Sequence, residues 1–281
     1  MSAPAEAAFP AAALRDALEA ARPRRIVGCS LEHHASLEST NDRARDLSLE
    51  GAAEGTVVIA DEQTRGRGRS GRSWHSPAGP GLYLSVLLRP AGRTDRSPLL
   101  ALATAVAAAE GLRRAAGVGV FIKWPNDLVM LDEAGRRLKV GGILTEARAG
   151  AEGLRDVVVG IGVNVNHQPH DFPAALARMA TSLRMARGRV VDRAGVALEI
   201  LCSLDDWYRV WCEAGDTPLL DAYRASAVDL EDRVVRVTEG QGPAWEGITA
   251  GLADDGGLRV RRRGEDLVTV RYGEIERVEE I

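Results

Sequence analysis

Four arginines lie within eight residues, from Arg65 to Arg72, and three glycines alternate with them. No carboxylate interrupts this run, although the whole chain of 281 residues has a formal net charge of -4. Guanidinium groups bind phosphate and carboxylate groups through paired hydrogen bonds, and glycine lets a backbone approach a ligand closely. The run therefore predicts a cationic loop at 64–73 that is mobile without its ligand and closes over an anion.

Three other interpretations of this run are weaker. A dinucleotide-binding fingerprint needs a helix directly after its glycines, but here Pro77 and Pro80 follow. No Lys-Ser or Lys-Thr pair closes the run, so it is not a P-loop. A basic linker or a nucleic-acid patch remains an alternative on composition. Apolar segments at 56–60 and 81–89 flank the run closely, and this favours a loop inside a domain.

The surrounding sequence predicts the elements that must hold this loop. Apolar runs predict strands at 56–60, 81–89, 120–123, 128–131, 138–147 and 154–163, the last of them central. Helical composition predicts helices at 11–22, 42–51, 97–116, 193–211 and 218–227. Residues 1–10 are rich in alanine and proline and are expected to fray.

The pattern changes after residue 230. Apolar and polar residues alternate in short segments that glycine-rich turns separate, which is typical of antiparallel strands. The predicted strands are 234–238, 244–250, 257–262 and 267–272. We therefore expect a small antiparallel β module at the C-terminal end.

The composition limits the classes of protein that fit. The chain is 45% apolar, so it can bury a core. Its three cysteines form no Cys-x-x-Cys pair, which suits a reducing cytoplasm. No apolar run reaches the length of about 20 residues that spans a bilayer. Aromatic residues make up only 4% of an acidic chain, which argues against a nucleic-acid-binding module with stacking aromatics.

Familiar catalytic motifs are missing from the sequence, including His-Glu-x-x-His and Gly-x-Ser-x-Gly. His167 and His170 have a metal-ligand spacing, but they lie in a proline-containing segment that we expect to be a solvated loop. His33 and His34 are expected at the surface. The remaining chemistry is one in which a substrate carboxylate is itself the nucleophile, and the protein aligns it with a phosphate and neutralises charge.

Five motifs in a fixed order give a specific family resemblance. The segment 63–74, QTRGRGRSGRSW, resembles the biotin-binding loop of biotin protein ligases. The other motifs are ESTND at 38–42, KWPND at 123–127, KVGGILTE at 139–146 and GIGVNVN at 160–166.

This resemblance implies an α+β fold with a central mixed or antiparallel sheet flanked by helices, similar to class II synthetases, and an SH3-like barrel after it. It implies a tail and short helix at 1–25, a catalytic domain at 26–229 and the SH3-like domain at 230–281. Regulatory members carry a DNA-binding module ahead of the catalytic domain. Only 38 residues precede Ser39, so we expect the monofunctional class.

The resemblance also implies the reaction. Biotin reacts with ATP, with Mg²⁺ as the accompanying ion, to give biotinyl-5′-AMP and pyrophosphate. A lysine of a biotin carboxyl carrier protein or domain then takes the biotin and releases AMP. The resemblance implies a cytoplasmic monomer or homodimer, without nucleic-acid or membrane partners and without a protein-bound metal.

The site residues follow from the same motifs. The resemblance implies biotin contacts by Ser39, Thr40, Asn41, Gln63, Arg67, Gly68, Arg69, Lys139 and Gly142. It implies ATP contacts by Arg67, Arg69, Arg72, Trp74, Asn126, Lys139 and Asn164. The implied catalytic residues are Arg69 and Lys139, at the carboxylate and α-phosphate, and Asp127, which orients the acceptor amine or takes its proton.

Several of these residues also have a purely structural interpretation. Ser39, Thr40 and Asn41 are typical helix N-cap residues, Trp74 is a packing anchor, and Lys139 is an exposed strand lysine. A lipoate–protein ligase and a non-catalytic biotin sensor are the alternatives for the whole chain. The biotin-family form of the loop and of KWPND favours biotin over lipoate, and Lys139 with Asp127 favours catalysis.

Overall fold

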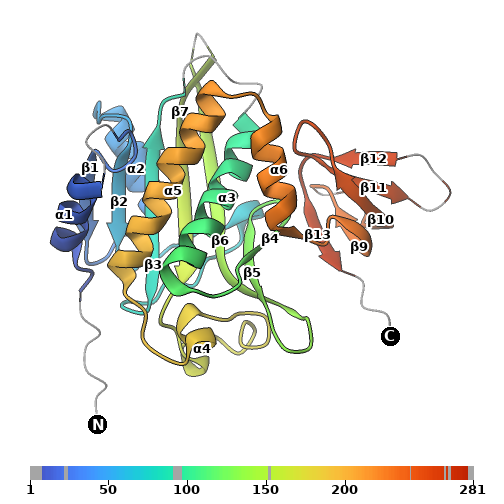
Figure 1. The fold of residues 1–281 in the computed structure, drawn as a ribbon, viewed down its shortest axis with the longest axis horizontal. Helices are drawn as coiled ribbons and strands as arrows, with labels where there is room; N and C mark the ends of the chain where they lie inside the picture. Colours follow the sequence, from blue (N-terminus) through green and yellow to red (C-terminus); the bar gives the residue numbers. More distant parts are fainter. Residues whose placement is uncertain are drawn as a thin grey trace.

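The computed structural model describes residues 8–21, 25–90, 97–150, 153–240, 242–262, 264 and 267–277. Within them, eight strands form one sheet in the order β1-β2-β3-β7-β6-β5-β4-β8 (Figure 1). The strands are β1 Ser30–His34, β2 Thr56–Ala60, β3 Gly81–Leu88, β4 Phe121–Lys123, β5 Asp127–Leu131, β6 Arg137–Gly150, β7 Gly153–Asn164 and β8 Ala227–Val228. Two strand pairs, β1–β2 and β4–β8, are parallel and the others are antiparallel, so the predicted mixed sheet is confirmed.

The centre of the sheet is made by β3, β7 and β6. All eight residues of β3 are buried, and β3 pairs with β7 from Gly81↔Asn164 to Leu88↔Val157. A strand buried on both faces reads as a continuous apolar run. The prediction that the strand at 154–163 is central is therefore confirmed.

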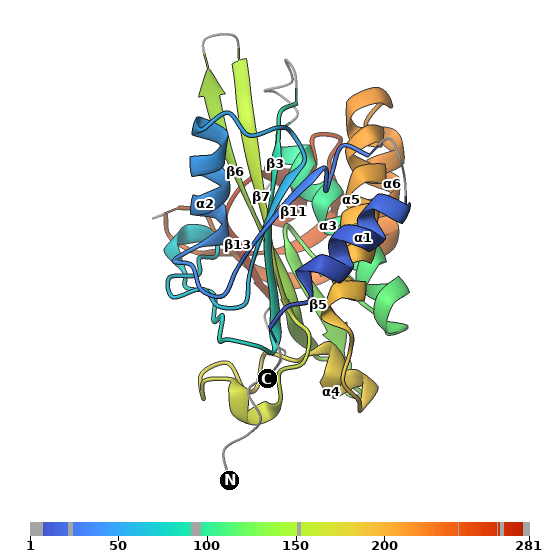
Figure 2. The same cartoon turned by 90° about the vertical axis from the view of Figure 1, so that its left-hand side faces the viewer.

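Helices cover both faces of this sheet (Figures 1 and 2). The helices are α1 Ala11–Ala21, α2 Thr40–Leu49, α3 Ser97–Ala116, α4 Leu183–Arg187, α5 Arg193–Glu213 and α6 Thr217–Ser226. Figure 2 shows α2 on one face and α3 with α5 on the other. The small side chains of α3 let α5 approach closely: a Cβ atom at Gly111 would lie 2.7 Å from the Cα atom of Ile200. Helices α3 and α5 cover the opposite face, so a ligand site can form on the face that carries α2.

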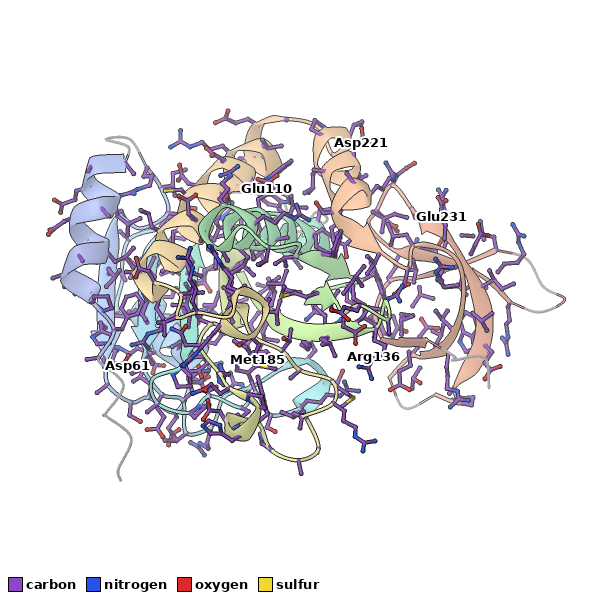
Figure 3. The ribbon with its side chains drawn as sticks, turned by 60° about the horizontal axis from the view of Figure 1, so that its bottom comes forward. Asp61, Glu110, Arg136, Met185, Asp221 and Glu231 are labelled. Carbon is purple, nitrogen blue, oxygen red and sulfur yellow. The ribbon has the colours of Figure 1, made fainter. Side chains whose placement is uncertain are left out.

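A second, antiparallel sheet follows α6, in the order β12-β11-β10-β9-β13. Its strands are β9 Glu231–Thr238, β10 Trp245–Leu252, β11 Leu258–Arg262, β12 Leu267–Val270 and β13 Glu274–Arg277. In Figure 3, Glu231 marks this sheet, and Asp61 lies far from it towards α1. The indole N–H of Trp124 donates to the Gly256 carbonyl at 3.0 Å, which ties the two sheets together. The predicted C-terminal β module is confirmed.

Some elements differ from the predictions. The sequence did not predict β1, α4, β8 or β13. Phe9 was expected to fray, but its side chain is buried and its backbone N–H donates to Asp61 at 2.9 Å. His33 was expected at the surface, but it is half-buried and lies 3.0 Å from the same carboxylate. The part of the predicted tail at 1–7 is outside the described residues. Among the described residues, no helix combines the length and apolar character needed to cross a bilayer.

Candidate active site

Glycines on adjacent central strands form the floor of the site. A Cβ atom at Gly160 would lie 2.2 Å from Oδ1 of Asn41, and one at Gly162 would lie 2.5 Å from Nε1 of Trp74. A Cβ atom at Gly142 would lie 3.6 Å from the Trp74 ring. Side chains from α2 and from the end of the arginine-rich loop can therefore lie directly on the backbone of β6 and β7.

The N-terminus of α2 supplies a buried polar cluster above this floor. Ser39 is the N-cap residue, and its hydroxyl accepts from the backbone N–H of Asp42 at 3.5 Å. Thr40 and Asn41 lie in the first turn and are buried. The predicted capping role of Ser39 is confirmed. The free N–H groups at a helix N-terminus can also bind a polar ligand.

Two further side chains complete this polar cluster. Oε1 of Gln63 accepts from the backbone N–H of Thr40 at 2.9 Å and from its hydroxyl at 3.0 Å. Oγ of Ser85 lies 2.7 Å from Oγ1 of Thr40 and 2.6 Å from Oδ1 of Asn41. Sequence reasoning missed Ser85. The only signal was a single serine within the apolar run of β3.

The arginine-rich loop forms a small hairpin beside this cluster. The backbone N–H of Trp74 donates to the Gly66 carbonyl at 2.8 Å, and that of Gly68 donates to the Arg72 carbonyl at 2.7 Å. A Cβ atom at Gly66 would lie 2.6 Å from Oγ of Ser76, so the base of the hairpin requires glycine. The tip of the hairpin is the 3-10 turn Arg69–Gly71, which lines a cavity together with Leu144 and Glu146 of β6.

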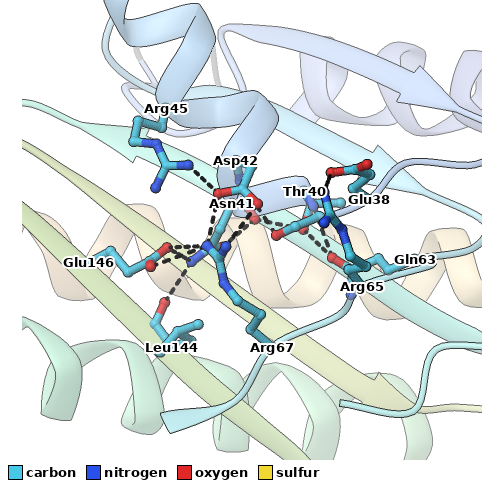
Figure 4. Close-up of polar contacts among 12 residues, drawn as sticks. Glu38, Thr40, Asn41, Asp42, Arg45, Gln63, Arg65, Arg67, Leu144 and Glu146 are labelled. Carbon is cyan, nitrogen blue, oxygen red and sulfur yellow. Dashed lines mark hydrogen bonds and ion pairs between the residues drawn. The ribbon is translucent and has the colours of Figure 1, made fainter. Parts of the chain in front are cut away.

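The arginines of this hairpin have different partners (Figure 4). Arg65 pairs with Glu38, and both side chains are exposed. Arg67 donates to both carboxylate oxygens of Asp42, at 2.9 and 2.8 Å, and to Glu146 at 3.3 and 3.4 Å.

The hydrogen bond to Asp42 raises the pKa of the Arg67 guanidinium above its usual value. Arg69 instead donates to the amide oxygen of Asn126 at 3.1 Å, and Arg72 is exposed. The sequence did not single out Asp42 or Glu146 as partners of Arg67.

A lysine–carboxylate pair lies at the other end of the glycine floor. Nζ of Lys139 is 2.5 Å from Oδ1 of Asp127 and 5.5 Å from the centre of the Trp74 ring. The turn before Asp127 is held by Tyr223, whose hydroxyl donates to the Pro125 carbonyl at 3.1 Å. The structure therefore brings Lys139, Asp127 and Trp74 together, each from a different motif.

The two predicted nucleotide-contacting asparagines hold backbone segments. Nδ2 of Asn126 donates to the Ile143 carbonyl at 2.5 Å. Asn164 is buried, and its Nδ2 donates to the Thr181 carbonyl at 3.0 Å. The backbone N–H of Thr181 in turn donates to the Lys139 carbonyl at 2.9 Å. Asn164 thus supports the strand that carries Lys139.

His167 corrects one sequence prediction. Its side chain is fully buried, stacked on Phe172 with ring centres 5.1 Å apart, so it does not lie in a solvated loop. Neither of its ring nitrogens has a hydrogen-bond partner within the described residues. Burial lowers the pKa of His167 to about 4. Within that same part of the chain, no group of three His, Cys, Asp or Glu side chains could hold a metal ion.

A cavity of about 510 Å³ opens where the hairpin faces the C-terminal sheet. The hairpin lines it from Arg67 to Gly71, and β6 lines it with Leu144 and Glu146. The turns of the second sheet line it with Gly240, Tyr272 and Gly273. Both sheets and the loop therefore share one space next to the glycine floor.

Comparisons with known proteins agree with this arrangement. Residues 34–164 match the model of the biotin/lipoate A/B protein ligase family. The bifunctional ligase/repressor BirA of Bacillus subtilis is 38% identical over 252 residues, covering 89% of this chain and 75% of that protein. The biotin--[acetyl-CoA-carboxylase] ligase of Paracoccus denitrificans is 33% identical and covers 81% of this chain and 92% of that protein.

A solved structure, the Aquifex aeolicus biotin protein ligase in complex with biotin and ATP, superimposes with a TM-score of 0.75. It is 27% identical and covers 90% of this chain and 100% of that one. The chain therefore belongs to the biotin/lipoate protein ligase family, and within it to the biotin protein ligases. The resemblance predicted from the five motifs is confirmed.

Proposed function

We propose that this chain activates biotin with ATP and transfers it to a lysine of a biotin carboxyl carrier protein or domain. The observation that carries this proposal is the meeting of Lys139, Asp127 and Trp74 at one end of a glycine floor whose other end is the Thr40–Asn41 polar cluster. Such a site has a polar pocket for the ureido ring and a cationic end for a carboxylate and a phosphate.

In the first half-reaction a carboxylate oxygen of biotin attacks the α-phosphorus of ATP. The bond from that phosphorus to the bridging oxygen breaks, and pyrophosphate leaves with the electron pair. Lys139 and Arg69 neutralise charge at the carboxylate and α-phosphate, and Arg72 adds charge towards the outgoing phosphates. Gly142 lets the substrate approach the backbone of β6 closely. Arg67 and Gly68 close the arginine-rich loop over the bound substrate.

In the second half-reaction the amine of the carrier lysine attacks the acyl carbon of the adenylate. The bond from the acyl carbon to the phosphate oxygen breaks and AMP leaves. Asp127 orients the amine and accepts its proton in this proposal, and its carboxylate lies 2.5 Å from Nζ of Lys139. Ser39, Thr40, Asn41 and Gln63 hold the other end of biotin in this proposal.

The nucleotide contacts are proposed on the same side of the floor. Trp74 offers an aromatic face, and Asn126 and Asn164 hold the backbone segments around the triphosphate and the base. Mg²⁺ is bound in proteins through one or two carboxylates and the substrate phosphates. Oδ1 of Asp127 accepts from Lys139 and Oδ1 of Asn126 accepts from Arg69, so the phosphates of ATP would be the main ligands of Mg²⁺ here.

ATP–pyrophosphate exchange with Mg²⁺ tests the first half-reaction before any carrier is known. We expect exchange that depends on biotin. Exchange with lipoate or octanoate but not with biotin would move the chain to the lipoate ligases, and no exchange with any acid would refute adenylation. Biotin transfer to an added carrier domain, followed by mass spectrometry, tests the second half-reaction.

We also propose the domain boundaries and setting of the protein. A catalytic domain at 26–229, preceded by a tail and short helix at 1–25, is followed by an SH3-like domain at 230–281. The start of β9 at Glu231 supports the second boundary. We propose a cytoplasmic enzyme without nucleic-acid partners. Light scattering after size exclusion distinguishes a monomer from a homodimer.

A further inference from the structure

The side chain of Arg67 is directed to carboxylates of the protein and not to the lysine end of the floor. It makes two parallel hydrogen bonds to Asp42, at 2.9 and 2.8 Å, and weaker ones to Glu146. Asp42 is in the first turn of α2, and Glu146 is on β6. One guanidinium therefore joins the loop to two other elements of the site.

We infer that Asp42 and Glu146 are positioning residues that latch the arginine-rich hairpin through Arg67, so that Arg67 closes the biotin pocket and does not bind the reacting anion. This inference rests on the proposed function and deepens it. The charge for the carboxylate and α-phosphate then comes from Arg69 and Lys139.

The geometry of Asp42 supports a latch. A planar guanidinium matches a carboxylate when both of its oxygens accept, and such paired charged hydrogen bonds are stronger and more directional than single ones. The three side chains are between about a quarter and two fifths exposed: 38% for Arg67, 27% for Asp42 and 37% for Glu146. The pair is thus less screened than an ion pair fully open to water.

Glu146 connects the latch to the pocket. Its Oε2 accepts from Nδ2 of Asn41 at 2.7 Å, while the same carboxylate accepts from Arg67. Asn41 also lies 2.6 Å from Ser85 and directly over Gly160. Opening the hairpin at Arg67 therefore removes a neighbour of the polar cluster that holds biotin.

The contacts of Arg67 argue against an anion on this side chain. A bound carboxylate or phosphate would have to replace the paired hydrogen bonds to Asp42, which also pairs with Arg45, and would meet the charge of Glu146. Arg69 donates instead to the neutral amide of Asn126, and Asn126 is next to Asp127 of the lysine pair. The two neighbouring arginines of the hairpin thus have separate tasks.

Limited trypsin digestion of the ligand-free protein tests the latch, because trypsin cleaves after arginine and the hairpin contains several. We expect Asp42→Asn and Glu146→Gln to speed cleavage in the hairpin, by about tenfold for Asp42→Asn if one charged hydrogen bond is lost. Glu38→Gln is the matched control. It removes an equal charge from the exposed Arg65 pair, and we expect cleavage within about twofold of wild type, as for a typical surface ion pair.

Binding and kinetics test whether the latch serves biotin. We expect Asp42→Asn to raise the biotin dissociation constant and the release rate of the adenylate, again by about tenfold, while the KM for ATP changes by less than about twofold. The double variant Asp42→Asn/Arg67→Ala should lose no more biotin affinity than the weaker-binding single variant, because both substitutions break the same contact. Thermal unfolding of each variant checks that the fold is intact, and Glu146→Gln leaves the first turn of α2 unchanged.

Two results would overturn the latch. One is equal trypsin sensitivity of Asp42→Asn, Glu146→Gln and wild type. The other is a rise in the KM for ATP in Arg67→Ala that Asp42→Asn does not share, since this would make Arg67 an anion ligand. The digestion needs no substrate, so it tests the latch independently of the proposed function. If the wild-type protein showed no biotin-dependent exchange, the proposed function would be refuted, and the cleavage rates would still decide whether the latch exists.

Discussion

Replacing Gly160 by alanine should weaken biotin binding without unfolding the protein. The added Cβ atom would lie 2.2 Å from Oδ1 of Asn41. Since non-bonded heavy atoms prefer separations of about 3.5 Å, Asn41 must move by roughly 1 Å or more. Gly160 pairs with Ser85 and Leu144 at the centre of the sheet, so the backbone of β7 has little freedom to move instead.

The size of the loss in biotin affinity can be estimated from the hydrogen bonds that Asn41 would lose. Its contacts with Ser85 at 2.6 Å and with Glu146 at 2.7 Å cannot both persist after such a shift. Each hydrogen bond contributes about 1 kcal/mol, so loss of both costs about 2 kcal/mol, or roughly a thirtyfold weaker biotin complex if biotin needs Asn41 in place. The free energy of unfolding should fall by a similar amount, up to about 2.6 kcal/mol, because overpacking costs about 1–3 kcal/mol and alanine in a strand returns about 0.4–1 kcal/mol.

Isothermal titration calorimetry with biotin measures the first quantity, and thermal unfolding measures the second. Gly215→Ala is the matched control, because a Cβ atom there meets nothing within 4 Å. We expect that variant to bind biotin as wild type does. A Gly160→Ala protein that binds biotin within twofold of wild type would refute the role of Asn41, and a protein that unfolds would show that the floor is mainly structural.

Three further changes test other parts of the site. Lys139→Ala should slow biotin-dependent pyrophosphate exchange by about 100-fold, since it removes a charge from the transition state. Asp127→Ala should slow biotin transfer to a carrier more than it slows exchange, because its proposed task is in the second step. His167 has a pKa near 4 in the folded protein and about 6.5 when unfolded, so the unfolded chain takes up a proton first as the pH falls. Folding stability should therefore drop between about pH 6.5 and 4, by up to about 3 kcal/mol, and chemical denaturation of His167→Phe should lack this slope.

The sequence predicted the regular elements where the local pattern is strong. Helix α3 begins and ends at the predicted residues, Ser97 and Ala116, because a long Ala- and Leu-rich segment has no competing turn signal. Strand β7 was found from its continuous apolar run. The edge strand β1, with the sequence SLEHH and no fully buried residue, carries no such pattern. The parallel pairing of β1 with β2 depends on tertiary structure, so it cannot be predicted from the local sequence of β1.

The five motifs located the site but not the contacts between its parts. Lys139, Asp127 and Trp74 meet because each motif marks one of the elements around the floor. Ser85 escaped notice because an apolar strand hides the one hydroxyl that touches Asn41. Glu146 is the last residue of a motif already quoted, yet its partner Arg67 is 79 positions away. Spacing along the chain carries no information about such a pair.

The arginine run shows why composition alone does not define function. Arg65, Arg67 and Arg69 have the same chemistry and alternate with the same residue type, so the sequence treats them as one cationic patch. In the fold, Arg65 meets an exposed carboxylate, Arg67 meets two partly buried ones, and Arg69 meets the neutral amide of Asn126, next to Asp127. Glu38 in the segment before α2, Asp42 in α2 and Glu146 on β6 therefore give a uniform run of arginines different partners, and the proposed latch and anion ligand rest on this difference.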